Sequence, residues 1–239
     1  MIGIEFRGQL GNQMYQYAYI RSVAERNNYD FSTYGTSQNP ELFNIFPDIK
    51  KYNLPFQYRW HIQEIDYDLK SIFYDLMDNT KVDGFFQNYQ YFENQPVKEW
   101  FQIKMSEEEK KQADDFIQKY DPSEYCYVHF RGNDFLNAMH ITTPPEFYKK
   151  AKLMTNNKKY VCITDDIDNA KLYTGIDECY QYNIKTDLYL LTKSKNLIIP
   201  MWSSYSFWGG WLSDAECIIA PYNSDKNYIM NNRFTYIKY

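Results

Sequence analysis

The chain has 239 residues, with 31 acidic and 26 basic side chains and a formal net charge of −5. This length allows one large domain or two small ones, and the acidic balance without a Lys/Arg-rich block argues against nucleic-acid binding. Because no apolar run approaches the ~20 residues that span a bilayer and Met1 leads directly into a strand-like segment, we expect a cytoplasmic protein without a signal peptide.

The four cysteines are widely separated and lack the C-x-x-C spacing of zinc and redox sites. Three of them lie in strand-like segments, which favours buried, reduced thiols. The three histidines also lack metal-ligand spacing, so we expect no metal site. The 25 tyrosines, 16 phenylalanines and 5 tryptophans suit a carbohydrate ligand, although most of these rings must belong to the core.

Strands and helices are predicted to alternate along the first part of the chain, as in an α/β fold. We expect a helix at Met14–Arg26, after a glycine-containing loop at residues 7–13, and we cannot assign residues 35–80. The expected strands are Ile2–Phe6, Tyr29–Tyr34 and Val82–Phe86.

A second α/β unit is predicted to follow a helix that begins at Ser106, where Ser106 and Glu109 form a capping box. Thr143 and Glu146 suggest a similar cap for a helix near Pro145–Met154, and Asp187 is expected to cap another helix. The expected strands are Tyr125–Phe130, Tyr160–Thr164, Leu197–Pro200 and Cys217–Ala220. The pattern predicts two Rossmann-like domains, residues 1–105 and 106–239.

Polar side chains follow the apolar strand Tyr125–Phe130, in the segment YCYVHFRGND. His129, Arg131 and Asp134 occur where this strand ends, and ligands of open α/β sheets bind outside the carboxyl ends of the strands. An arginine there can bind two phosphate oxygens at once. The alternative is an arginine that forms a salt bridge with Asp134 on a surface loop.

Four separated segments together resemble one family. They are GQLGNQMYQYAYIRSVAE at residues 8–25, GFFQNYQYFE at 84–93, VHFRGNDF at 128–135, and ITDD at 163–166 followed by DLYLLTKSKNLIIPMWSSYSFWGGWL at 187–212. In this order they resemble the α-1,2-fucosyltransferases of glycosyltransferase family 11, which carry a GG-LGNQMFQYA opening, a GYFQ-x-x-KYF segment, an H-x-R-R-x-D loop and an SSFSWWGAWL block. The resemblance covers most of the chain, except about residues 35–80 and the tail after Pro221.

The resemblance implies a GT-B fold, with two facing Rossmann-like domains and the active site in the cleft between them. Residues 1–105 would form the acceptor side and residues 106–239 the donor side. The implied reaction is inverting transfer of L-fucose from GDP-fucose to O2 of a terminal galactose, without a metal. The chain departs from the family at Gly132, which replaces the second arginine of the loop, at Gly8-Gln9 and at Trp202.

The resemblance assigns Arg131 to the β-phosphate of GDP, whose developing negative charge a guanidinium can stabilise. Ser203, Ser204 and Ser206 open a helix, so they either bind phosphate or act as an ordinary N-cap. Asn12 is expected to be catalytic from the loop after the first strand, and Gln13 to bind the donor, unless Asn12 only caps the next helix.

Asp187 is a candidate for binding guanine, because a carboxylate can accept from both N1–H and the exocyclic amine. His129 is placed near the nucleoside, although a histidine on an apolar strand is more often a core residue. Asp165-Asp166 resembles half of a D-x-D metal motif, but we interpret Asp166 as a nucleotide or ribose contact or as a helix cap. Trp202 is a candidate acceptor contact.

The general base of the reaction stays open at this stage. Asp134, His140 and Glu5 are candidates, and a phosphate oxygen of the departing GDP is a fourth. Two alternatives to fucosyl transfer also remain. One is a transferase of the same fold that uses another GDP-sugar, and the other is a glycan-binding descendant without activity.

Overall fold

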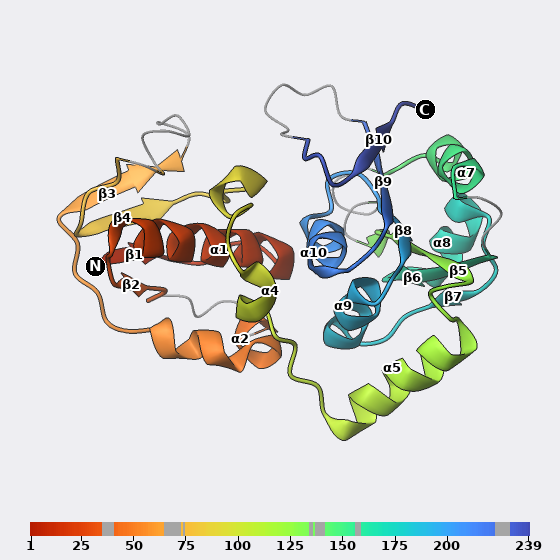
Figure 1. The fold of residues 1–239 in the computed structure, drawn as a ribbon, viewed down its shortest axis with the longest axis horizontal. Helices are drawn as coiled ribbons and strands as arrows, with labels where there is room; N and C mark the ends of the chain where they lie inside the picture. The colour runs from red at the N-terminus through yellow and green to blue at the C-terminus, as the bar shows by residue number, and fades with distance from the viewer. Residues whose placement is uncertain are drawn as a thin grey trace. The chain divides into compact units, whose positions relative to one another are not determined.

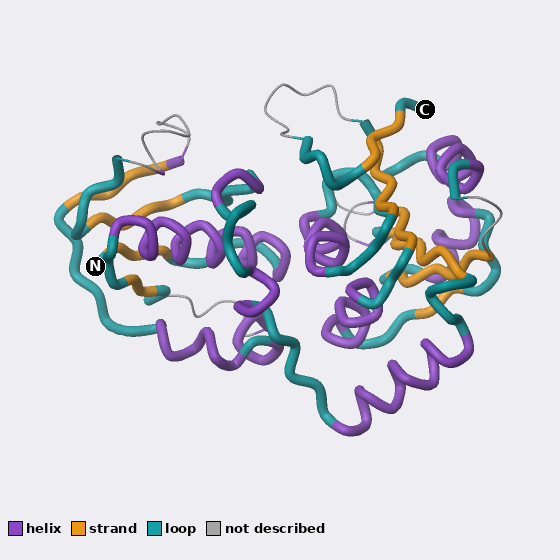
Figure 2. Tube along the Cα trace, in the orientation of Figure 1, coloured by secondary structure: helices purple, strands orange, loops and turns teal. Residues whose placement is uncertain are grey.

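The computed structural model of the chain describes residues 1–34, 41–64, 73, 75–133, 136, 142–155, 159–222 and 230–239. The chain divides into two compact units, Met1–Lys104 and Met105–Tyr239 (Figures 1 and 2). Each unit contains one parallel sheet with helices packed against it. The α/β fold expected from the sequence is therefore confirmed, whereas the facing arrangement of the two domains stays a prediction.

The N-terminal unit is built on a four-stranded parallel sheet with the strand order β2-β1-β4-β3. Its strands are β1 (Ile2–Ile4), β2 (Phe31–Ser32), β3 (Trp60–Gln63) and β4 (Thr80–Asp83). Its helices are α1 (Leu10–Asn27), α2 (Glu41–Ile45), η1 (Pro47–Tyr52), η3 (Tyr89–Tyr91) and α4 (Val97–Trp100). Strand β3 lies within residues 35–80, which the sequence left unassigned, and β4 begins at the last of these residues and overlaps the expected strand Val82–Phe86.

The two faces of the N-terminal sheet differ in chemistry. Ile2, Ile4 and Val82 are buried on the face that α1 covers. The alternation of a strand places Gly3, Lys81 and Asp83 on the other face. On this second face the ring of Phe56 lies so close to Gly3 that an added Cβ would be 2.3 Å from it.

The C-terminal unit is built on a six-stranded parallel sheet with the strand order β10-β9-β8-β5-β6-β7. Its strands are β5 (Tyr125–Phe130), β6 (Lys159–Thr164), β7 (Cys179–Tyr180), β8 (Asn196–Ile198), β9 (Cys217–Pro221) and β10 (Thr235–Ile237). Its helices are α5 (Glu107–Lys119), α7 (Pro145–Leu153), α8 (Ile167–Thr174), α9 (Ile184–Thr192) and α10 (Ser204–Leu212).

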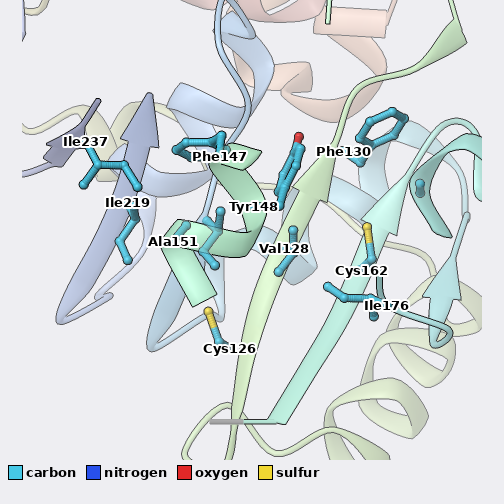
Figure 3. Close-up of a cluster of buried hydrophobic side chains, with 12 residues drawn as sticks. Cys126, Val128, Phe130, Phe147, Tyr148, Ala151, Cys162, Ile176, Ile219 and Ile237 are labelled. Atoms are coloured by element: carbon cyan, nitrogen blue, oxygen red, sulfur yellow. The ribbon is translucent and has the colours of Figure 1, made fainter. Parts of the chain in front are cut away.

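Alternate residues of β5 lie on opposite faces of the sheet and have different neighbours. Val128 and Phe130 pack against Phe147 and Ala151 of α7 in a fully buried apolar cluster (Figure 3). His129 points to the other face, where it meets α10. The period of two along the strand thus puts a core residue and a polar residue next to each other at its carboxyl end. Of the cysteines, Cys126 and Cys162 are buried, whereas Cys179 and Cys217 are half-buried, and all four are reduced.

The helix boundaries confirm one cap that the sequence predicted and correct two others. The capping box of Ser106 and Glu109 is confirmed at the start of α5. Helix α9 is capped by Asn183, whose side chain accepts from two backbone N–H groups, so Asp187 is inside the helix and is not its cap. Helix α7 starts at a proline without a side-chain cap, because Thr143 accepts instead from the backbone of Met201 at 2.8 Å.

The first helix begins earlier than predicted. It starts at Leu10 rather than Met14, which puts Asn12 and Gln13 in its first turn and not in a loop. The glycines of this segment suggested a loop. Leu10 and Gly11 are nevertheless buried and lie within the helix. No helix in the described part of the chain is both long and apolar enough to cross a bilayer.

Candidate functional site

Each sheet contains one point where the chain reverses the direction in which it adds strands. In the C-terminal unit, β5 is followed by β6 and β7 on one side and by β8 on the other. In the N-terminal unit, β1 is followed by β2 on one side, and β4 pairs with its other side. Open α/β sheets bind ligands at the carboxyl ends of such neighbouring strands. We therefore expect the site residues of each unit to lie at this edge of its sheet.

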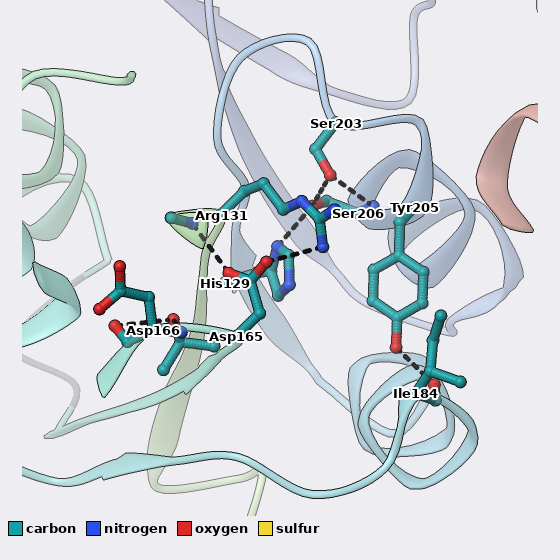
Figure 4. A network of polar contacts seen from close by, with 10 residues as sticks. His129, Arg131, Asp165, Asp166, Ile184, Ser203, Tyr205 and Ser206 are labelled. Carbon is teal, nitrogen blue, oxygen red and sulfur yellow. Dashed lines mark hydrogen bonds and ion pairs between the residues drawn. The ribbon is translucent and has the colours of Figure 1, made fainter. Parts of the chain in front are cut away.

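Arg131 leaves β5 at the switch point of the C-terminal unit and forms an ion pair with Asp165. The distance from its Nη1 to Asp165 Oδ2 is 2.8 Å, and both side chains are about one-fifth exposed. Asp165 Oδ1 accepts from the backbone N–H of Gly132 at 2.8 Å. The carboxylate at the end of β6 thus positions both the guanidinium and its loop (Figure 4).

His129 connects β5 to the first turn of α10. Its Nδ1 is 2.6 Å from Ser206 Oγ, and Ser206 Oγ donates to Ser203 Oγ at 2.7 Å. Because the single hydroxyl proton of Ser206 goes to Ser203, His129 Nδ1 must carry the proton that completes this chain. Burial, assisted by the charge of Arg131, lowers the pKa of His129 to about 3, so the ring is neutral.

Ser203 is the N-cap of α10, as one of the two interpretations of the serines predicted. Its side chain accepts from the backbone N–H of Ser206 at 3.2 Å. Ser204 is the first residue of the helix, and the preceding Trp202 is exposed and has a left-handed φ of 62°. The α10 N-terminus thus adjoins the end of β5, and its first-turn amides are suited to an anion.

Asp187 is buried one turn into α9. Its Oδ1 accepts from the backbone N–H of Tyr182 at 3.2 Å. Burial raises its pKa to about 8, with a further contribution from the negative charge of Asp165. A carboxyl group kept protonated by burial near neutral pH is typical of functional sites.

Asp166 caps α8, as the sequence allowed. Its Oδ1 accepts from the backbone N–H of Asn169 at 3.2 Å, and its Oδ2 accepts from the Asn169 side chain at 2.7 Å. Its neighbour Asp165, to which the sequence analysis assigned no role of its own, is the carboxylate that pairs with Arg131. The signal that could have found it is its position directly after β6 at the same sheet edge as Arg131.

Asn12 and Gln87 link the two segments that follow β1 and β4 in the N-terminal unit. Gln87 Nε2 donates to Asn12 Oδ1 at 2.6 Å. Gln13 is only 1 % exposed, and its amide donates to the carbonyl of Gly8 at 2.9 Å. The buried Gln13 side chain therefore stabilises the turn before α1. Of the two predicted residues, Asn12 is the more exposed to solvent.

Only one of the three side chains proposed as a general base, Glu5, lies among the described residues. Glu5 accepts from the ammonium of Lys81 at 3.1 Å. Asp134 and His140 lie outside the described residues. The sequence analysis missed His61, which lies 2.5 Å from Asp83 on the neighbouring strand. No cluster of three metal-binding side chains is found among the described residues, and metal independence stays a prediction.

The comparisons with known proteins concern this fold. No protein-family model and no curated protein matches the sequence. The fucosyltransferase NodZ from Bradyrhizobium is 17% identical, with 89% of this chain and 92% of that chain covered and a TM-score of 0.57. NodZ α-1,6-fucosyltransferase soaked with GDP-fucose is 16% identical over the same shares of both chains, with a TM-score of 0.54.

A more distant solved structure gives the same result. A variant of Arabidopsis thaliana FUT1 in complex with GDP is 11% identical, with 98% of this chain and 72% of that chain covered and a TM-score of 0.53. At such identities the likeness concerns the fold. The chain thus has the α/β, GT-B-like fold of these fucosyltransferases.

Proposed function

We propose that the protein is an inverting fucosyltransferase that uses GDP-fucose as its donor and O2 of a terminal galactose as its acceptor. The observation that carries the proposal is Arg131, held by Asp165 at the switch point of the C-terminal sheet. Two further points support it: the GT-B-like fold, and the four ordered sequence segments that resemble the α-1,2-fucosyltransferases. Residues 106–239 then bind the donor, and residues 1–105 bind the acceptor.

In this proposal Arg131 binds the diphosphate of the donor. Departure of GDP places negative charge on the β-phosphate, and a guanidinium fixed beforehand can stabilise it without reorganisation. Asp165 accepts from Nη1 of this guanidinium and so fixes its position. The amides at the start of α10 and the hydroxyl of Ser204 complete the anion site.

The nucleoside is assigned to Asp187 and His129. An ionised Asp187 can accept from N1–H and the exocyclic amine of guanine, which adenine does not offer. Because burial raises the pKa of Asp187 to about 8, GDP must bind together with the loss of a proton below that pH. We therefore expect GDP affinity to rise between pH 6.5 and 8, and ADP to bind poorly.

Asn12 and Trp202 are assigned to the sugars. Asn12 is half-buried beside Gln87, at the switch point of the N-terminal sheet, where an amide can bind sugar hydroxyls. Trp202 is 44% exposed, and an exposed indole can stack on the apolar face of a galactose ring. The α-1,2 linkage follows from the sequence resemblance alone, and the NodZ neighbour is an α-1,6-fucosyltransferase.

The direct experiment is transfer to a panel of galactosides. The purified protein is incubated with GDP-fucose and an acceptor in the presence of EDTA, and the product is analysed by mass spectrometry and methylation analysis. We expect fucose on O2 of the terminal galactose, with inversion at the fucose carbon. Turnover of other GDP-sugars but not of GDP-fucose would refute the donor assignment.

A second candidate is a transferase of the same fold with another GDP-sugar donor. The observation behind it is Gly132, which leaves one arginine where the resembled loop has two. A thermal-shift screen of GDP-fucose, GDP-mannose and GDP separates these donors. A glycan-binding protein without activity would instead bind galactosides equally well after Arg131→Ala.

A further inference from the structure

A histidine and a carboxylate form a dyad on the second face of the N-terminal sheet. His61 Nε2 is 2.5 Å from Asp83 Oδ2, and the two residues lie on the paired strands β3 and β4. Arg7 Nη2 is 3.2 Å from the same carboxylate oxygen. The Asp83 carboxylate thus joins a strongly exposed arginine, from the segment after β1, to a histidine on the edge strand.

The pairing fixes which nitrogen of the His61 ring donates to the carboxylate. An ionised carboxylate can only accept hydrogen bonds, so Nε2 of His61 must be the donor. Nδ1 of the neutral ring then carries a lone pair. Among the described residues no hydrogen bond to Nδ1 is found, and the His61 side chain is 40% exposed. The ring thus presents a basic nitrogen to the surroundings of the sheet.

The burial of the Asp83 carboxylate reduces the stability of the fold, as is common for functional residues. Asp83 is only 7% exposed, and its Oδ1 is buried without a hydrogen-bond partner in the described part of the chain. An incompletely satisfied buried carboxylate destabilises a fold. Its presence at the carboxyl end of β4, where it contacts a histidine, is explained if the orientation of that histidine is needed for chemistry.

We infer that His61 is the general base that removes the proton of the acceptor hydroxyl, and that Asp83 is its positioning residue. The inference rests on the proposed function. The acceptor O–H bond breaks, and its proton goes to Nδ1 of His61. The acceptor oxygen then forms the bond to the fucose carbon, whose bond to the β-phosphate oxygen breaks, and the electron pair leaves with GDP.

The surroundings suit a sugar acceptor better than an ion. Tyr58 is 50% exposed, and its ring centre lies 6.1 Å from that of His61, so an apolar sugar face can stack beside the base. The charged groups on this face are paired with each other, Glu5 with Lys81 and Arg7 with Asp83. A neutral hydroxyl is therefore the ligand that this face accommodates without unpaired charge.

The experiment compares His61→Ala, His61→Gln and Asp83→Asn with Gln63→Ala, an exposed position two residues along the same strand. We expect kcat for transfer to fall roughly 10²–10³-fold in the first three variants. The affinity for GDP should be unchanged, and Gln63→Ala should transfer at the wild-type rate. Added imidazole should restore part of the activity of His61→Ala, which a merely structural histidine would not allow.

Transfer by His61→Gln at the wild-type rate would overturn the inference alone, whereas absence of transfer by the unaltered protein would refute the proposed function and with it this role.

Discussion

Gly132 lies against Asp166, and this contact explains why the chain carries a glycine where the resembled loop has its second arginine. A Cβ at position 132 would be 2.5 Å from Asp166 Cβ and 2.7 Å from Asp166 Oδ2. Asp166 cannot easily move, because its carboxylate caps α8. We predict that Gly132→Ala lowers the free energy of unfolding by about 1–3 kcal/mol, as overpacking does.

A double-mutant cycle tests the cause of this loss. Asp166→Gly removes the obstructing Cβ and costs little as a cap, since glycine is tolerated at the N-cap. In the background of Asp166→Gly, Gly132→Ala should be close to neutral. Urea unfolding of the four proteins measures the coupling, and equal costs in both backgrounds would show that Asp166 is not the obstacle.

Asp187 makes the stability of the protein depend on pH between about 4 and 8. Burial raises its pKa from 3.8 to about 8, so between these values the folded chain holds a proton that the unfolded chain has lost. Stability from this group therefore falls as pH rises, by roughly 1.4 kcal/mol per pH unit. Asp187→Asn should gain stability relative to the wild type between pH 6.5 and 8, measured by urea unfolding. A difference that does not vary with pH would contradict the prediction.

His129 has the opposite effect on the acidic side. Its pKa is lowered from 6.5 to about 3, chiefly by burial, so below pH 6.5 the unfolded chain takes up a proton that the folded chain does not. This contribution to stability is lost as pH falls from 6.5 towards 3. His129→Asn keeps a donor for Ser206 but does not titrate, so it should lose less stability than the wild type between pH 6.5 and 4.5. An NMR titration that shows protonation of the His129 ring near pH 6.5 would refute the assignment.

Asn12 and Gln87 should act as one unit in catalysis. Their side chains are hydrogen-bonded at 2.6 Å and come from segments that follow neighbouring strands. We predict that Asn12→Ala and Gln87→Ala each reduce kcat/KM for transfer. The kcat/KM of the double variant should be nearly the same as that of the less active single variant. The non-additivity should be about 0.5–1.5 kcal/mol, the usual contribution of one such bond. Fully additive losses would mean that the two residues act separately.

The strands of the C-terminal unit were the most predictable part of the fold. Tyr125–Phe130 is a continuous apolar run, as expected for a strand buried on both faces, and it forms β5 with those bounds. The helix at Ser106 was equally clear, because its capping box is a local signal. Strand β3 was missed, since three of its four residues are exposed and its stability comes from pairing with β4.

The positions of the candidate site residues at the strand ends were predictable, whereas their pairings were not. The sequence placed Arg131 directly after a strand, as the structure does, yet its partner proved to be Asp165, which is 34 positions further along the chain. The sequence instead suggested Asp134, which lies outside the described residues. Similarly, Asp187 looked like a helix cap because aspartate favours that position, although Asn183 caps the helix. Such contacts depend on which strands become neighbours, and local patterns do not carry that information.

The central claim, that Arg131 binds the β-phosphate of GDP, is tested most directly by calorimetric titration with GDP and with GMP, which lacks that phosphate. Arg131→Ala is compared with Lys159→Ala, which removes a positive charge at the opposite end of the same sheet. We predict that Arg131→Ala weakens GDP binding roughly 10–150-fold, the loss of a charge-assisted hydrogen bond, and leaves GMP binding and the Lys159→Ala control nearly unchanged. Equal affinity of Arg131→Ala and the wild type for GDP would contradict the account.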